Sequence, residues 1–247
     1  MTTMHRLVLW NLDHTLVDVG RVTREAYAEA FQRVTGRPLV RLAPTAGRTE
    51  SEIIFETLAF NDVETTDDHL PMFMAELARA FEGRRGDVRA HGRVLPGAKE
   101  ALAAVGRLGN VVQTVLTGSI RDNAAVKATE LGLGRYLDLE VGGYGSEVYP
   151  KGTLIELART RASQKYGVPF DESAAWLRGD RVIATIYIAD SAADVRAAQI
   201  ARCPIVAVAT GSATETELRD AGADVVLPTL GDTATVVRAV EYLTGRS

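Results

Sequence analysis

The stretch that decides the fold is LVLWNLDHTL, residues 7–16. Its first four residues are apolar, and the next five include asparagine, aspartate, histidine and threonine. A short apolar run that ends in a polar cluster is typical of a buried parallel strand followed by a functional loop. We therefore expect residues 7–10 to form an inner strand, with Asn11 and Asp13 exposed to a ligand at its carboxyl end.

Working outward, the chain alternates between helical and strand patterns from Leu95-Pro96-Gly97 onward. Strands separated by helices of this length predict right-handed crossovers, and so an α/β fold with a doubly wound parallel sheet. Ligands bind such sheets at the carboxyl ends of the strands. The expected helices cover residues 98–108, 122–131 and 152–162, and the expected strands cover 111–116, 137–141, 186–188, 205–208 and 224–227.

Between the first strand and this alternating region, residues 19–93 have a helical pattern. Apolar residues recur at helical spacing from Val22 to Val34, and Gly36 is a plausible helix stop. Thr49 and Glu52 match a capping box at the start of a second helix. A third helix is expected after Pro71, and the polar residues 82–87 are expected to form a hinge or loop.

Bulk properties exclude several classes of protein. The 247 residues carry a formal net charge of −4 without a long basic run, which argues against nucleic-acid or anionic-lipid partners. Cys203 is the single cysteine, and the four histidines lack zinc-ligand spacing. No apolar run is long enough to cross a membrane, and the N-terminus does not resemble a signal peptide, so a cytoplasmic protein is expected.

Four polar clusters follow apolar strands or precede helices. An acidic residue after a strand is more often a helix cap than a catalyst, but four clusters in this order favour a common site. They are residues 11–15, Thr117-Gly118-Ser119, Lys151, and the pair Asp190 and Asp194.

Phosphoryl transfer is the chemistry that these residue types fit. Two loop carboxylates and a backbone carbonyl form the oxygen-rich site that Mg²⁺ prefers. Thr117 and Gly118 can bind phosphate oxygens, and Lys151 can neutralise charge in the transition state. Asp13, two residues after Asn11, is placed to act as a general acid and base.

The motifs Asn11-x-Asp13-x-Thr15, Thr117, Lys151 and Asp190-x-x-x-Asp194 resemble the four motifs of the haloacid dehalogenase superfamily, over essentially the whole chain. The resemblance implies a core domain of residues 1–18 and 94–247 and a helical cap of residues 19–93.

The same resemblance implies a role for each motif. In the family, the first-motif residue is an aspartate that becomes an aspartyl-phosphate. Mg²⁺ is held at positions equivalent to Asn11, the Asp13 carbonyl and Asp190, while Asp194 orients the water around the metal. Thr117, Gly118 and Lys151 bind the phosphoryl group. Arg48, in Gly47-Arg48-Thr49, resembles a cap residue that faces the substrate, although a simple helix start explains this segment equally well.

Asp13 favours a phosphatase within this superfamily, because the dehalogenases lack the second aspartate. A phosphonate-cleaving member needs a cap lysine, and the first lysine of this chain is Lys99, beyond the predicted cap. The sequence therefore predicts a Mg²⁺-dependent phosphatase that acts on a small phosphomonoester.

Asn11 departs from the family pattern, because an amide is a poor nucleophile and carries no charge for the metal. Three explanations stay open: an engineered replacement, a natural protein that lost catalysis, and an enzyme that uses Asp13 or a bound water instead. Ala189 and His14 stand where the family commonly has glycine. The alternative function is therefore a catalytically inactive member that binds a phosphate ligand or acts in regulation.

Overall fold

The computed structural model describes residues 3–147, 150–170, 176–178 and 181–245. One seven-stranded sheet has the order β5-β4-β1-β7-β8-β9, and β6 pairs with β7. Every pair is parallel except β6–β7. The strands are β1 (Thr3–Trp10), β4 (Val111–Thr117), β5 (Gly143–Tyr144), β6 (Trp176–Arg178), β7 (Arg181–Ala189), β8 (Ile205–Val208) and β9 (Val225–Leu227). The predicted doubly wound α/β fold is confirmed.

β1 lies inside the sheet, between β4 and β7. Because successive side chains of a strand point to opposite faces, its apolar residues supply both hydrophobic cores. Leu7 and Leu9 pack with α7 (Thr153–Tyr166) and α8 (Ala192–Ile200). Val8 and Trp10 belong to the other core, with α5 (Ala98–Val105) and α10 (Thr233–Thr244). Burial on both faces explains the unbroken apolar run.

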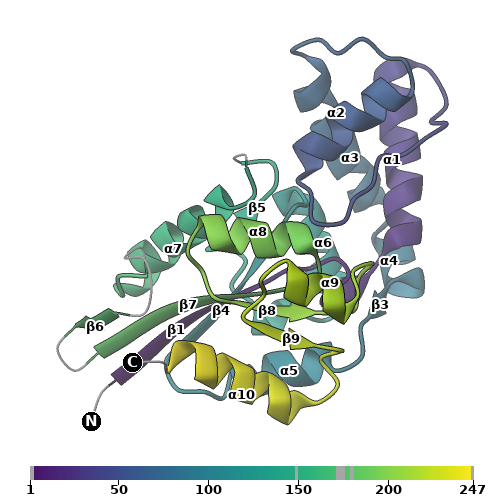
Figure 1. The fold of residues 1–247 in the computed structure, drawn as a ribbon. Coiled ribbons are helices and arrows are strands. Elements are labelled where there is room, and N and C mark those ends of the chain that lie inside the picture. The colour runs from purple at the N-terminus through teal and green to yellow at the C-terminus, as the bar shows by residue number, and fades with distance from the viewer. Residues whose placement is uncertain (1–2, 148–149, 171–175, 179–180, 246–247) are drawn as a thin grey trace.

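A group of three helices stands over the carboxyl ends of the strands, and we call it the helical lobe (Figure 1). It consists of α1 (Gly20–Thr35), α2 (Glu50–Phe60) and α3 (His69–Gly83). The Phe73 ring packs against Tyr27 and Phe31, with ring centroids 5.7 and 6.4 Å apart. The predicted C-terminal stop at Gly36, with φ of 72°, and the capping box of Thr49 with Glu52 are both confirmed.

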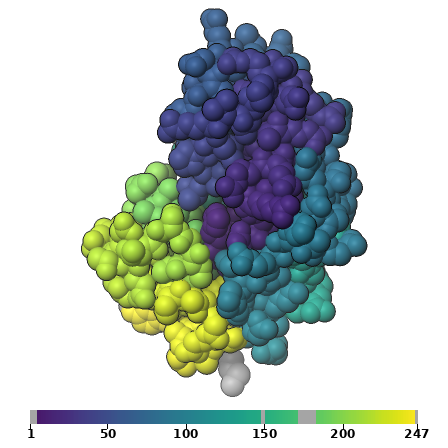
Figure 2. Space-filling view, turned by 90° about the vertical axis from the view of Figure 1, so that its right-hand side faces the viewer, coloured from purple at the N-terminus to yellow at the C-terminus, as the bar shows by residue number. Residues whose placement is uncertain are grey.

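The chain enters and leaves the lobe side by side. β2 (Val17–Asp18) pairs antiparallel with β3 (Arg93–Val94), and the Arg93 guanidinium lies 2.6 Å from the Asp18 carboxylate. The space-filling view shows the lobe, in purple and blue, resting on the rest of the molecule (Figure 2). The remaining helices are α4 (Arg85–His91), α6 (Arg121–Glu130), α9 (Glu215–Asp220) and the short 3-10 helix η1 (Gly134–Tyr136).

Two sequence-based expectations are wrong. The strand predicted over residues 137–141 is absent, and the edge strand is β5, paired with Leu116 and Thr117. The Asp138 side chain accepts a hydrogen bond from the Glu140 N–H at 3.0 Å, and this local turn competes with a strand ladder.

The polar residues 82–87 do not form a loop, because α3 ends at Gly83 and α4 begins at Arg85. Arg85 pairs with Glu82 and Glu130, which explains why a charged stretch is helical here.

Other predicted elements differ mainly at their ends. β7 extends well beyond the expected 186–188, and α7 runs to Tyr166. The third lobe helix begins at His69, two residues before Pro71, because proline is tolerated in the first turn of a helix. Among the described residues, no helix is long and apolar enough to cross a membrane.

Candidate active site

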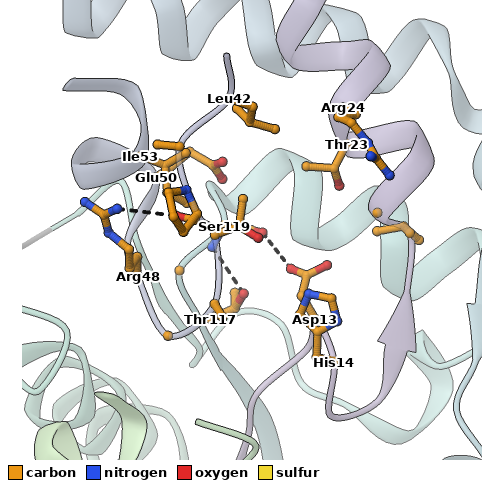
Figure 3. A pocket seen from close by; sticks show the side chains of 18 of the residues that line it. Asp13, His14, Thr23, Arg24, Leu42, Arg48, Glu50, Ile53, Thr117 and Ser119 are labelled. Carbon is orange, nitrogen blue, oxygen red and sulfur yellow. Dashed lines mark hydrogen bonds between the residues drawn. The ribbon is translucent and has the colours of Figure 1, made fainter. Parts of the chain in front are cut away.

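A pocket of about 510 Å³ lies between the helical lobe and the carboxyl ends of β1 and β4. Its walls include six of the residues singled out in the sequence: Asn11, Asp13, Arg48, Thr117, Gly118 and Lys151. Asp190 and Asp194 lie behind this lining and bind its members directly. Figure 3 shows Asp13 and Thr117 at the base of the pocket and Arg48 on its lobe side.

Asn11 is buried directly after β1, where its N–H donates to the Ile188 carbonyl at 2.8 Å. Its side-chain amide nitrogen donates to two oxygens: Asp190 Oδ1 at 2.8 Å and the Asp13 carbonyl at 3.1 Å. The Thr15 hydroxyl donates to the same Asp190 oxygen at 2.8 Å. These are the two oxygens that the family resemblance assigns to a metal, and a single NH₂ group reaches both.

The Asp190 and Asp194 carboxylates lie at the buried end of β7 and the start of α8. Burial, with the charge of Asp194 as the second cause, raises the pKa of Asp190 to about 6. Lys151 Nζ lies 2.6 Å from Asp194 Oδ1, which also accepts from the Tyr187 hydroxyl at 2.8 Å. The Ser191 hydroxyl donates to Asp194 Oδ2 at 2.5 Å. Lys151 is therefore held by a fully hydrogen-bonded carboxylate.

Thr117 is the last residue of β4, and Gly118 begins the turn that follows it. The Ser119 N–H donates to Thr117 Oγ1 at 3.2 Å, and the Gly118 carbonyl accepts from the Glu50 N–H of the lobe at 2.8 Å. A Cβ on Gly118 would lie 1.8 Å from the Arg48 carbonyl oxygen. Only glycine allows the lobe to approach this turn so closely.

Lys127 is a site residue that the sequence did not indicate. It belongs to α6, is 3% exposed, and binds both oxygens of the Asp13 carboxylate at 2.7 and 2.9 Å. The Ser119 hydroxyl is 3.1 Å from Asp13 and 2.9 Å from Lys127. Burial alone would raise the pKa of Asp13, but the Lys127 charge and these hydrogen bonds outweigh it and lower the pKa. The lowered pKa favours the ionised form of Asp13, which is the form that can accept a proton.

Glu50 is a second residue that the sequence did not indicate. It is the first residue of α2 and is buried where the lobe meets the core. Its carboxylate accepts hydrogen bonds from the Tyr27 hydroxyl and from the Ile120 N–H at 3.2 Å. Burial raises the pKa of Glu50, although the Lys127 charge and the Tyr27 hydrogen bond oppose this rise. Glu50 therefore connects two lobe helices to the loop between β4 and α6.

Arg48 and His14 line the pocket from opposite sides. The Arg48 guanidinium forms an ion pair with Glu56 of α2. His14 has a positive φ of 63°, and its carbonyl accepts from the Thr210 hydroxyl at 2.6 Å. A left-handed residue at this turn explains why glycine suits the position, and the Thr210 contact helps to hold the histidine there.

The donor set at Asn11 fits a hard cation such as Mg²⁺. The Asp13 carbonyl and the Asp190 carboxylate face one point, because the Asn11 amide contacts both. An asparagine side chain also carries an oxygen that can ligate Mg²⁺ once the amide turns over. The site has one carboxylate fewer than the family motif. Among the described residues no three His, Cys, Asp or Glu side chains come together as metal ligands, so this set depends on amide and backbone oxygens beside Asp190.

Comparison with known proteins identifies the family. Residues 8–199 match the model of the haloacid dehalogenase-like hydrolases, which is most of the chain. The chain belongs to this family. No curated protein matches it.

Solved structures share the fold. A hydrolase from Pseudomonas syringae has a TM-score of 0.64 at 20% identity, covering 96% of this chain and 98% of its own. A putative beta-phosphoglucomutase from Bacteroides vulgatus has a TM-score of 0.65 at 16% identity, and the match covers 99% of this chain and 92% of that protein. CbbY from Rhodobacter sphaeroides, solved in complex with phosphate, has a TM-score of 0.64 at 18% identity, and the match covers 94% of this chain and 96% of that protein. At these identities the likeness establishes the fold, while the site must be argued from this chain's own residues.

Proposed function

We propose that this chain is a phosphatase-type member of its family whose pocket holds a small phosphomonoester together with Mg²⁺. The observation that carries the proposal is the convergence of Asn11, Asp13, Thr117 and Lys151 on one pocket. A hydroxyl, a lysine and backbone amides at the carboxyl ends of neighbouring strands suit the three oxygens of a phosphoryl group.

Each residue has a distinct task in this proposal. Thr117, Gly118 and Lys151 bind the phosphoryl oxygens, and Asp194 holds Lys151 in place. Asn11, the Asp13 carbonyl and Asp190 are the Mg²⁺ ligands, with Asp194 behind them. The metal, when bound, neutralises phosphoryl charge. Asp13 is the proposed general base, and it acts as a general acid in the step for which it carries a proton.

The lobe completes the site. We propose that residues 19–93 form a cap domain on a core of residues 1–18 and 94–247, with the boundaries at the β2–β3 pair. Closure of the cap over the pocket would exclude water from the reacting group. Arg48 is the cap residue proposed to face the substrate.

Asn11 limits turnover, because its amide cannot act as the nucleophile that the family motif supplies. The test is phosphate release from a panel of phosphomonoesters with Mg²⁺, for this chain and for Asn11→Asp. We expect release by the variant to exceed that of the parent by at least two orders of magnitude. Peptide mass spectrometry must first show that Asn11 has not deamidated. Release by neither protein would overturn the phosphatase proposal.

One observation favours the second candidate, a non-catalytic module that binds a phosphate ligand. The Asn11 amide already neutralises part of the Asp190 charge and contacts both proposed metal ligands. Phosphate binding that needs no divalent cation follows from this arrangement. Calorimetric titration with inorganic phosphate, with Mg²⁺ or with a chelator, distinguishes the two: cation-independent binding without turnover in Asn11→Asp supports the module.

A further inference from the structure

Arg24 is a pocket cation that has no partner among the described residues. It lies on α1, exposed at the lobe side of the pocket, and Figure 3 shows it beside Thr23, across the pocket from Arg48. Within the part of the chain that the structure describes, its guanidinium has neither a hydrogen bond nor an ion pair. Its neighbour on the same helix, Arg21, is paired with Glu25 at 2.9 Å.

The other cations of the pocket have partners. Lys127 binds Asp13, Lys151 binds Asp194, and Arg48 binds Glu56. Arg41, at the same mouth, stacks over the Phe60 ring with its guanidinium carbon 4.1 Å from the centroid. Among the residues that the structure describes, Arg24 is therefore the pocket cation whose charged group has no ion pair, hydrogen bond or aromatic ring contact. A guanidinium binds carboxylate or phosphate oxygens through two parallel hydrogen bonds, and such pairs are stronger than neutral ones.

The pocket is also larger than one phosphoryl group requires. Its volume of about 510 Å³ lies in the range of sites that enclose a whole small molecule. Thr117, Gly118 and Lys151 occupy the core end, whereas Arg24 belongs to the lobe. A ligand bound at both ends would place its carbon skeleton between them.

We propose that Arg24 forms a second anion-binding subsite, so that the preferred ligand is a phosphomonoester with a second anionic group, a carboxylate or a second phosphate, at its far end. This inference rests on the proposed function, because it takes the phosphoryl group to be bound at the core end. An ester with an uncharged far end leaves Arg24 facing the ligand without a partner when the pocket is filled.

Calorimetric titration of the chain as it stands tests the subsite with matched ligands. Ethyl phosphate is compared with phosphoglycolate, and n-butyl phosphate with 4-phosphonooxybutanoate and with butane-1,4-diol bisphosphate. We expect at least one charged ester to bind about tenfold more tightly than the alkyl ester of equal length, as a charge-assisted hydrogen bond allows. The better of the carboxylate and the bisphosphate identifies the anion, and the better chain length gives the spacing.

Two variants separate Arg24 from general electrostatics. Arg24→Gln should reduce affinity for the charged ester about tenfold more than for the alkyl ester. Arg21→Gln removes an equal charge from the same helix and should leave the preference intact. Equal losses for both ligands in Arg24→Gln, or no preference in the parent, overturn the subsite. Failure of the parent to bind even inorganic phosphate or an alkyl phosphate overturns the proposed function itself.

Discussion

The two sides of the pocket differ in how their charged side chains are paired. We call the side formed by the sheet and its flanking helices the core wall, and the side formed by the helical lobe the lobe wall. On the core wall, the Lys127 and Lys151 ammonium groups are buried against the Asp13 and Asp194 carboxylates. On the lobe wall, Arg48 has a partly exposed ion pair and Arg24 faces the pocket from α1. Removal of a core charge therefore leaves a partner unpaired in a low-dielectric interior, whereas a lobe charge is largely solvated. The core wall suits a group common to many ligands, and the lobe wall can vary with the rest of the ligand.

Among substitutions that test this difference between the walls, Lys151→Met is expected to reduce stability the most. The substitution leaves the Asp194 carboxylate buried without its ammonium partner, which should reduce the free energy of unfolding by about 3–5 kcal/mol. Urea denaturation measures the change. Lys165→Met is the matched control, because Lys165 pairs with Asp138 and Glu140 at the surface, and its loss should cost less than about 1 kcal/mol. Equal costs for the two variants would contradict the contrast between the walls.

Gly118→Ala tests the junction between the walls. Its new methyl group would meet the Arg48 carbonyl at 1.8 Å, and a backbone oxygen cannot move aside as a side chain can. We expect a loss of about 1–3 kcal/mol in stability and faster proteolysis of the lobe. Gly109→Ala is the control, since nothing lies within 4 Å of a Cβ there. A Gly118→Ala protein as stable and as protease-resistant as the control would show that the lobe does not rest on this turn.

The buried Glu50 gives a pH-dependent test of the same junction. Burial raises the folded pKa of Glu50, so at pH values between the unfolded and the folded pKa the native state holds a proton that the unfolded chain has released. The ionised Glu50 thus lowers stability above its folded pKa, and this effect disappears as the pH falls toward the unfolded value of about 4.3. Each pKa unit by which the folded value exceeds the unfolded value costs about 1.4 kcal/mol of stability when Glu50 is ionised.

Thermal unfolding of the parent and of Glu50→Gln at several pH values measures this effect. The melting temperature of the parent should rise relative to the variant as the solution is acidified from pH 8 to pH 5. A difference that stays constant with pH would mean that Glu50 is not the titrating group.

The smallest stability effect is expected from Arg48→Gln. Its partner Glu56 is about one-third exposed, so loss of the ion pair should change stability by less than about 1 kcal/mol. If Arg48 contacts the ligand, affinity for phosphate esters should fall by about fivefold in calorimetric titration. Unchanged affinity would leave Arg48 as a helix-start residue, the simpler explanation of its sequence.

The fold was predictable because its signals are local. The apolar run of β1 and the glycine that ends α1 can each be recognised from a few neighbouring residues. The four polar clusters each follow a strand or precede a helix. The chain brings Asn11, Thr117 and Lys151 to one pocket because parallel strands end at one edge of the sheet.

Lys127 and Glu50 could not be predicted in this way. Lys127 lies in the middle of α6, where a lysine is usually solvated, and its partner is 114 residues away in the sequence. Glu50 follows the capping threonine, where an acidic residue is expected for its effect on the helix dipole alone. Their roles depend on how the lobe packs on the core, and that packing has no local signature.

The β2–β3 pair holds the two ends of the lobe segment next to each other. Residues 19–92 begin and end at neighbouring positions, so the length of this segment has no effect on the register of β1 and β4. Insertions and deletions in this segment, or its exchange as a whole, leave its two ends in place. The entropic cost of bringing those ends together grows only slowly with the length of the segment. The architecture thus lets ligand preference diversify by replacement of one continuous segment while the sheet that carries Asn11 is inherited unchanged.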